Sequence, residues 1–120
     1  MAIILVVEDD LLLSLDISEA LEDEGYNVIA VANADEAIKV LETRNDIRTI
    51  FTDIDLPGSM DGLKLAAAVR DRWPPVHIIV TTGMRAPHRD EMPANSMFIA
   101  KPYRSAEVRR CALVRMNALP

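Results

Sequence analysis

One cysteine and two histidines are all that the 120 residues contain, and this excludes several kinds of site at once. The lone Cys111 cannot form a disulfide within the chain or build a cysteine-based metal centre. With only His77 and His88, a zinc site has too few ligands, and neither histidine stands at a spacing typical of nucleophilic catalysis. We therefore interpret Cys111 as a small apolar residue of a helix, His77 as a strand residue and His88 as a surface residue.

Positive charge and long apolar runs are also scarce. The chain has 13 Lys and Arg against 19 Asp and Glu, so its formal net charge is −6. Nucleic-acid phosphates require clustered positive charge, so direct nucleic-acid binding is not expected. No apolar run approaches the roughly 20 residues of a membrane span, and the first residues do not resemble a signal peptide. The sequence predicts a cytoplasmic protein with no membrane partner, folded as one domain over residues 1–120.

Apolar runs alternate with amphipathic stretches along the whole chain. Solid apolar or β-branched runs predict strands, and these fall at residues 3–7, 26–31, 49–54, 76–82 and 97–100. Between them, helical spacing with capping signals predicts helices at about 11–24, 34–44 and 62–73, and from Ser105 onward. The segment from Met84 to Ser96 contains two prolines, so at most one or two helical turns are expected there.

Five such β–α units predict an α/β fold. The expected architecture is a doubly wound, five-stranded parallel sheet with flanking helices, in which the fourth helix is short or irregular. Right-handed crossovers fit the flavodoxin-like order 2-1-3-4-5, although strand patterning alone leaves other orders open. In that order the first and third strands are neighbours, and a crevice lies beyond their carboxyl ends.

Chemically different side chains stand where four of these strands end. Glu8 and Asp9 follow the first strand, Asp53 ends the third, and Thr82 and Lys101 close the fourth and fifth. Each has an ordinary explanation by itself, as a helix cap, a turn residue, a β-former or a solvated lysine. Because the carboxyl ends of parallel strands share one rim, the set together predicts a functional site.

The acidic residues of this set predict a metal site. Carboxylates gathered at one place require a compensating cation or proton. Oxygen ligands alone suit a hard divalent ion, so we expect Mg²⁺ to be held by Glu8, Asp9 and Asp53. The backbone carbonyl of Asp55, in the loop after the third strand, is a further candidate ligand.

The same set fits phosphoryl transfer. A carboxylate such as Asp53 can attack phosphorus and give an acyl phosphate. The transferred group carries negative charge on its oxygens, which Mg²⁺ and the ammonium group of Lys101 would compensate. The Thr82 hydroxyl could donate a hydrogen bond to one phosphoryl oxygen.

Five motifs in order resemble the receiver domain of bacterial two-component response regulators. They are Val6-Val7-Glu8-Asp9-Asp10, Thr52-Asp53-Ile54-Asp55-Leu56-Pro57, Asp61-Gly62, Thr82-Gly83 and Lys101-Pro102. The resemblance implies that Asp53 accepts a phosphoryl group from a sensor histidine kinase or a histidine phosphotransfer protein, with Mg²⁺ required. It also implies a signalling switch that hydrolyses its own acyl phosphate slowly and controls a downstream partner, so the chain is not expected to be an enzyme.

Residue roles can be carried over position by position. The resemblance assigns metal binding to Glu8, Asp9 and the Asp55 carbonyl, the hydroxyl role to Thr82 and the invariant-type lysine to Lys101. Phe98, three residues before that lysine, matches the aromatic residue that moves inward on activation. A strand core role explains Phe98 equally well.

Several alternatives stay open. The loop over residues 57–62 is one residue longer than is usual for receivers, and Thr81 could take the place of Thr82. Asp53-Ile54-Asp55 also resembles the Asp-x-Asp of haloacid dehalogenase-type hydrolases, but Pro57 stands where that family has Thr or Val, and there is no room for a cap domain. A receiver-like module that is never phosphorylated is a second rival. The sequence does not identify the cognate kinase or the output. It also leaves open whether a domain follows residue 120 and which oligomeric state the protein has, including a homodimer through the last two helices.

Overall fold

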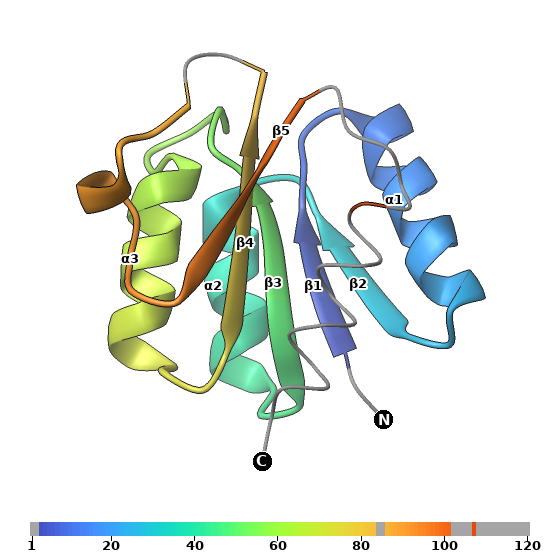
Figure 1. Ribbon diagram of the computed structural model, residues 1–120. Helices are drawn as coiled ribbons and strands as arrows, with labels where there is room; N and C mark the ends of the chain where they lie inside the picture. Colours follow the sequence, from blue (N-terminus) through green and yellow to red (C-terminus); the bar gives the residue numbers. More distant parts are fainter. Residues whose placement is uncertain (1–2, 84–85, 102–106, 108–120) are drawn as a thin grey trace.

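The five strands form one parallel sheet. The computed structural model describes residues 3–83, 86–101 and 107 (Figure 1). Neighbouring strands pair in the order β2-β1-β3-β4-β5, which confirms the flavodoxin-like order. The strands are β1 (Ile3–Val7), β2 (Asn27–Val31), β3 (Ile47–Asp53), β4 (His77–Thr82) and β5 (Ser96–Ala100).

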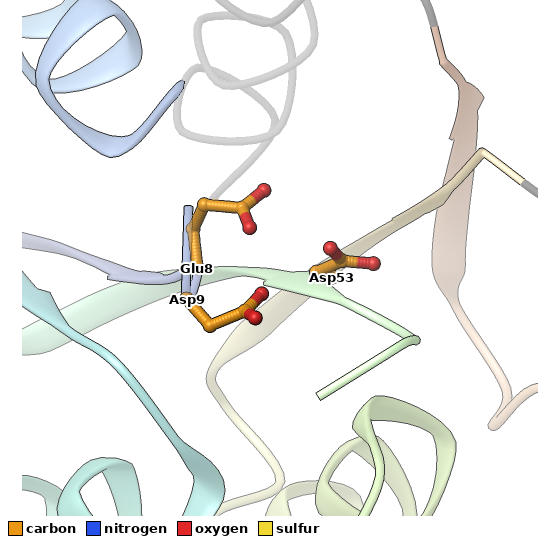
Figure 2. Close-up of side chains that lie close together, drawn as sticks. All are labelled: Glu8, Asp9 and Asp53. Carbon is orange, nitrogen blue, oxygen red and sulfur yellow. The ribbon is translucent and has the colours of Figure 1, made fainter. Parts of the chain in front are cut away.

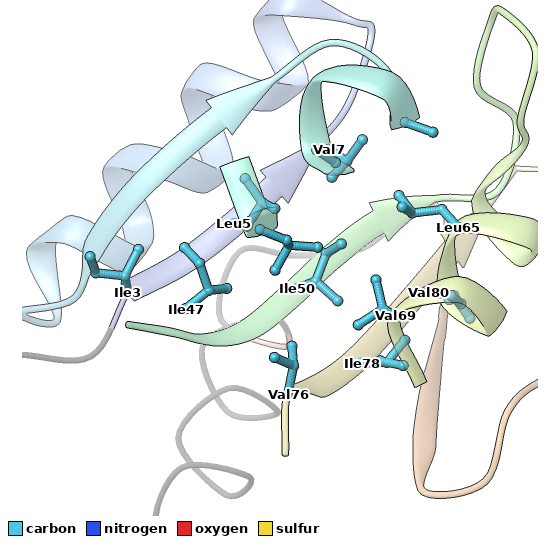
Figure 3. Close-up of a cluster of buried hydrophobic side chains, with 14 residues drawn as sticks. Ile3, Leu5, Val7, Ile47, Ile50, Leu65, Val69, Val76, Ile78 and Val80 are labelled. Carbon is cyan, nitrogen blue, oxygen red and sulfur yellow. The ribbon is translucent and has the colours of Figure 1, made fainter. Parts of the chain in front are cut away.

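Helices cover both faces of the sheet. In Figure 1, α1 (Leu11–Asp23) lies on one face, and α2 (Ala34–Thr43) and α3 (Gly62–Arg72) lie on the other. Each face has its own hydrophobic core. The larger core joins α2 and α3 to the sheet (Figure 3), whereas α1 contributes Ile17 and Leu21 to the smaller one.

The first strand shows how one short run serves both cores. All five residues of β1 are buried. Side chains alternate between the two faces of a strand, so Leu5 and Val7 join the larger core, while Ile4 and Val6 join the smaller one. This double burial is why the run is continuously apolar, and it fixes where the strand ends and the polar residues Glu8 and Asp9 begin.

The helices around the site begin at side-chain caps. Asp10 accepts hydrogen bonds from the backbone N–H groups of Leu12 and Leu13, and Asp61 accepts one from the N–H of Lys64. From the sequence, either Asp9 or Asp10 can cap α1, because both directly precede it. Since Asp10 takes this role, the Asp9 carboxylate is available at the rim of the sheet.

Among its described residues, the connection between β4 and β5 contains one turn of 3₁₀-helix, η1 (Arg89–Glu91), within the one or two turns expected. Arg70 of α3 holds this connection, because its Nε donates to the Ala94 carbonyl at 2.9 Å. Apart from the one helical residue Glu107, the predicted helix from Ser105 lies outside the described residues, and so do Cys111 and this helix's part of the surface considered for a homodimer. Within the described part of the chain, no helix is long and apolar enough to cross a membrane.

Candidate functional site

Three carboxylates converge at the carboxyl ends of β1 and β3. One oxygen of each of Glu8, Asp9 and Asp53 lies within 4.8 Å of the others. Figure 2 shows the side chains of Glu8 and Asp9, which follow β1, extending toward Asp53 at the end of β3. Glu8 and Asp53 are each only 3% exposed, whereas Asp9 is exposed. The structure therefore brings together the acidic residues that the strand order placed at one rim.

Lys101 reaches this cluster from the end of β5. Its Nζ lies 2.7 Å from Asp53 Oδ2 and 3.3 Å from Glu8 Oε1. The Lys101 backbone N–H donates to the Thr82 carbonyl at 3.0 Å, which extends the pairing of β4 with β5 to the lysine. The ammonium group thus offsets two buried negative charges.

The pKa values reflect this arrangement. Burial raises the pKa of Glu8 above its ordinary 4.5, and the Asp53 charge adds to the rise, although the N–H of Asp10 and the Lys101 ammonium oppose it. Burial by itself lowers the pKa of Lys101. The hydrogen bond and charge of Asp53, together with Glu8, outweigh burial and raise the pKa above 10.5. The lysine therefore stays charged throughout the physiological range.

Removing the ammonium group should destabilise the metal-free protein. We expect Lys101→Met to lower the free energy of unfolding at pH 7 by about 1–3 kcal/mol, because two buried carboxylates lose their cationic partner. Urea denaturation in the presence of a chelator measures the effect. Lys39→Met, on the exposed face of α2, is the matched control and should stay within about 0.5 kcal/mol of the wild type.

The pH dependence of this difference follows from the two shifts. Because the pKa of Lys101 is raised in the folded state, its contribution is complete below pH 10.5 and is lost as the pH rises through the folded-state value. At the acid end, the raised pKa means that Glu8 becomes protonated at a pH above 4.5. A neutral Glu8 then loses its charge interaction with the Lys101 ammonium group. The stability gap between Lys101→Met and the wild type should therefore be widest near neutral pH, and a gap constant from pH 4 to 11 would contradict the ion pairing.

The two threonines at the end of β4 point to opposite faces. Thr82 donates its hydroxyl to Asp55 Oδ2 at 2.5 Å, and the Asp55 backbone N–H donates to Asp53 Oδ1 at 2.9 Å. Thr81 is fully buried, and its hydroxyl has no hydrogen-bond partner among the described residues. Of the two hydroxyls, the one on Thr82 is linked to Asp53 through a neighbouring residue, which favours Thr82 for the role proposed below.

The donor set fits a hard cation. Every candidate ligand is an oxygen, and the two buried carboxylates of Glu8 and Asp53 share one ammonium group, so negative charge is left in excess. A buried carboxylate oxygen in this condition is a place where a cation compensates the cost of desolvation. Glu8, Asp9 and Asp53 are therefore the residues that could hold Mg²⁺.

Gly62 belongs to the Asp61-Gly62 motif, but the sequence predicted no role for it at the site. A Cβ atom at Gly62 would lie 2.0 Å from the Asp53 carbonyl oxygen and 2.6 Å from Ile54 Cα. Its own N–H donates to the Ile54 carbonyl at 2.8 Å. The first residue of α3 thus packs directly on the backbone that carries Asp53. In the loop over residues 57–62, Gly58 has a φ of +98°, which favours glycine.

Phe98 lies apart from the acidic cluster. It is half-buried on β5, packs against the larger core and lines a surface pocket of about 510 Å³ with Pro87, Met92 and Pro93 of the β4–β5 connection. Its backbone pairs with Val80, two residues before Thr82. Phe98 is therefore placed between the site and the irregular connection.

The family is shown by sequence comparison. A family model described as the response regulator receiver domain matches residues 4–112. The chain belongs to this family. Members of this family are signalling switches in two-component systems. The match agrees with the five sequence motifs, from Val6 to Pro102, that resemble the family.

Individual relatives support the same assignment. The response regulator protein FleR of Pseudomonas aeruginosa is 34% identical over 86 residues, which cover 72% of this chain and 18% of FleR. The chain spans less than a fifth of the length of the curated relatives it matches. A response regulator receiver protein from Sinorhizobium medicae is 29% identical with a TM-score of 0.91, covering 98% of this chain and 95% of that one. A receiver domain protein from Methanospirillum hungatei, 24% identical with a TM-score of 0.86, covers 98% of this chain and 94% of that one and shares the fold.

Proposed function

We propose that residues 1–120 act as one receiver domain in which Asp53 accepts a phosphoryl group from a histidine kinase or a histidine phosphotransfer protein. The observation that carries the proposal is that Asp53 lies beside both the acidic residues that could hold a metal ion and the ammonium group of Lys101. Its carboxylate shares a cluster of acidic oxygens with Glu8 and Asp9, and it binds the Lys101 ammonium group at 2.7 Å. A nucleophilic carboxylate beside fixed positive charge is what phosphoryl transfer requires.

In the transfer step, a carboxylate oxygen of Asp53 forms a bond to phosphorus as the phosphorus–nitrogen bond of the phosphohistidine breaks. The electron pair of the broken bond stays on the imidazole nitrogen. Mg²⁺, held by Glu8, Asp9 and Asp53 with the Asp55 carbonyl as a further ligand, would supply positive charge to the phosphoryl oxygens. Water later hydrolyses the acyl phosphate and regenerates the carboxylate.

The remaining residues stabilise and report the new charge. Lys101 is positioned to form an ion pair with the phosphoryl group, because it already lies against Asp53. The Thr82 hydroxyl would turn to a phosphoryl oxygen. We propose that this movement lets Phe98 move inward, changing the surface formed by β5 and the β4–β5 connection, on which an as yet unidentified downstream partner reads the state of the domain.

Mass spectrometry tests this function directly. After incubation with acetyl phosphate and Mg²⁺, we expect one phosphoryl group per chain, and none when a chelator is present. Borohydride reduction converts a phosphorylated aspartate to homoserine, and peptide mapping should find it at position 53. Homoserine at another position would reject Asp53 as the acceptor. No incorporation from either acetyl phosphate or a phosphorylated histidine phosphotransfer protein would favour a receiver-like module that is never phosphorylated.

A further inference from the structure

The role proposed above for Asp55 involves only its backbone carbonyl, as a metal ligand. Its side chain makes a separate contact. Its Oδ2 accepts the hydroxyl proton of Thr82 at 2.5 Å. Asp55 itself is exposed, while Thr82 is 2% exposed and is held in the ladder between β4 and β5. The sheet thus fixes the Thr82 backbone, and the position of its hydroxyl still depends on the χ1 rotamer.

A threonine hydroxyl carries one proton and donates it to one acceptor at a time. If Asp53 is phosphorylated, its phosphoryl oxygens compete with the Asp55 carboxylate for that proton. Both acceptors are anionic, so the exchange replaces one charge-assisted hydrogen bond by another. The Asp55 backbone N–H also donates a hydrogen bond to Asp53 Oδ1 at 2.9 Å. The residue whose carboxylate competes for the proton is therefore hydrogen-bonded to the residue that would be phosphorylated.

We infer that the Asp55 carboxylate is a latch that holds the Thr82 hydroxyl in the unphosphorylated domain and sets how readily phosphorylation switches it. This inference rests on the proposed function and adds regulation to the same site. Asp55 acts through Thr82 and is a positioning residue. Since releasing the latch takes part of the binding free energy of the phosphoryl group, a chain without it should switch more easily.

The resting contact can be tested without any phosphodonor. In the metal-free full chain, three-bond NMR couplings report the χ1 rotamer of Thr82. A single rotamer is expected in the wild type and in Asp55→Asn, whose amide oxygen can still accept the hydroxyl proton. Rotamer averaging is expected in Asp55→Ala. The same single rotamer in Asp55→Ala would overturn the latch.

The competition is tested with beryllofluoride and Mg²⁺ as the phosphoryl analogue. Asp55→Ala removes a negative charge as well as the latch, so the comparison is repeated in a Thr82→Val background, where only the charge effect remains. The gain in beryllofluoride affinity on Asp55→Ala should be about tenfold larger in the chain that keeps Thr82 than in the Thr82→Val chain, which lacks the hydroxyl. Equal gains in the two backgrounds would overturn the competition.

Different results would reject the proposed function and the Asp55 latch. A wild-type chain that binds no beryllofluoride and takes up no phosphate from acetyl phosphate would reject the proposed function. The Thr82 rotamer result does not depend on either ligand. A labelled wild type together with an unchanged rotamer in Asp55→Ala would reject the latch and leave Asp53 as the acceptor.

Discussion

Asp53→Asn should reduce phosphate incorporation from acetyl phosphate and Mg²⁺ to background while leaving the fold intact. An amide oxygen is not a nucleophile toward phosphorus under these conditions, so no acyl phosphate can form. The substitution keeps the volume of the side chain, and one amide oxygen can still accept the Asp55 N–H that now binds Asp53 Oδ1. The amide nitrogen would then face Lys101, so the loss of the 2.7 Å ion pair is the main structural change.

Asp10→Asn is the matched control for this experiment. It removes one negative charge, as Asp53→Asn does, from the acidic residue that follows Asp9 in the sequence. Asparagine caps a helix as well as aspartate does, so α1 should be preserved. Incorporation in Asp10→Asn should therefore resemble that of the wild type. Both variants should show the far-ultraviolet circular dichroism of the wild type. Phosphate that still appears on folded Asp53→Asn would assign the acceptor to another carboxylate.

Much of the fold could be predicted because burial on both faces leaves a clear pattern in the sequence. The run Ile3–Val7 is apolar at every position, and the structure buries all five residues. The strand boundaries differ from expectation by only one or two residues, as at β3, which begins at Ile47 instead of Thr49. The strand order then brings Glu8 and Asp53 to one rim, which needs no knowledge of side-chain conformations.

The parts that could not be predicted depend on side-chain conformation and tertiary contact. Alternation places Thr82 and Thr81 on opposite faces but does not say that the Thr82 hydroxyl binds Asp55. Two prolines exclude a long helix after β4, yet the position of η1 also reflects the hydrogen bond from Arg70 to the Ala94 carbonyl. These contacts join residues far apart in the sequence, and no local pattern encodes them.

Gly62→Ala is the substitution with the largest expected effect on stability, and its sign separates two arguments. Alanine is favoured over glycine within a helix by about 1 kcal/mol, so helix propensity alone predicts a more stable protein. A Cβ atom at this position would lie 2.0 Å from the Asp53 carbonyl oxygen, far closer than any van der Waals contact. We expect the steric effect to dominate and to lower the free energy of unfolding by about 3 kcal/mol.

Two other glycines provide controls. A Cβ atom at Gly83 would lie 3.7 Å from Lys101 Cδ, an ordinary contact, so Gly83→Ala should change the free energy of unfolding by less than about 0.5 kcal/mol. Gly58 has open space around it but a φ of +98°, so Gly58→Ala should cost about 1–2 kcal/mol through backbone strain alone. Urea denaturation of the three variants therefore separates steric overlap from conformational strain.

Gly62→Ala should also impair the site, because the atoms that the added methyl group would displace belong to the backbone of Asp53 and Ile54. Moving that backbone shifts the Asp53 carboxylate relative to Glu8 and Lys101, so Mg²⁺ affinity and phosphate incorporation should fall in folded Gly62→Ala. A variant as stable and as readily labelled as the wild type would require α3 to move away from β3 at no cost. The 2.8 Å hydrogen bond from the Gly62 N–H to the Ile54 carbonyl opposes that movement, since the buried Gly62 N–H would lose its partner, whereas the carbonyl would keep only the N–H of Leu56 at 3.1 Å.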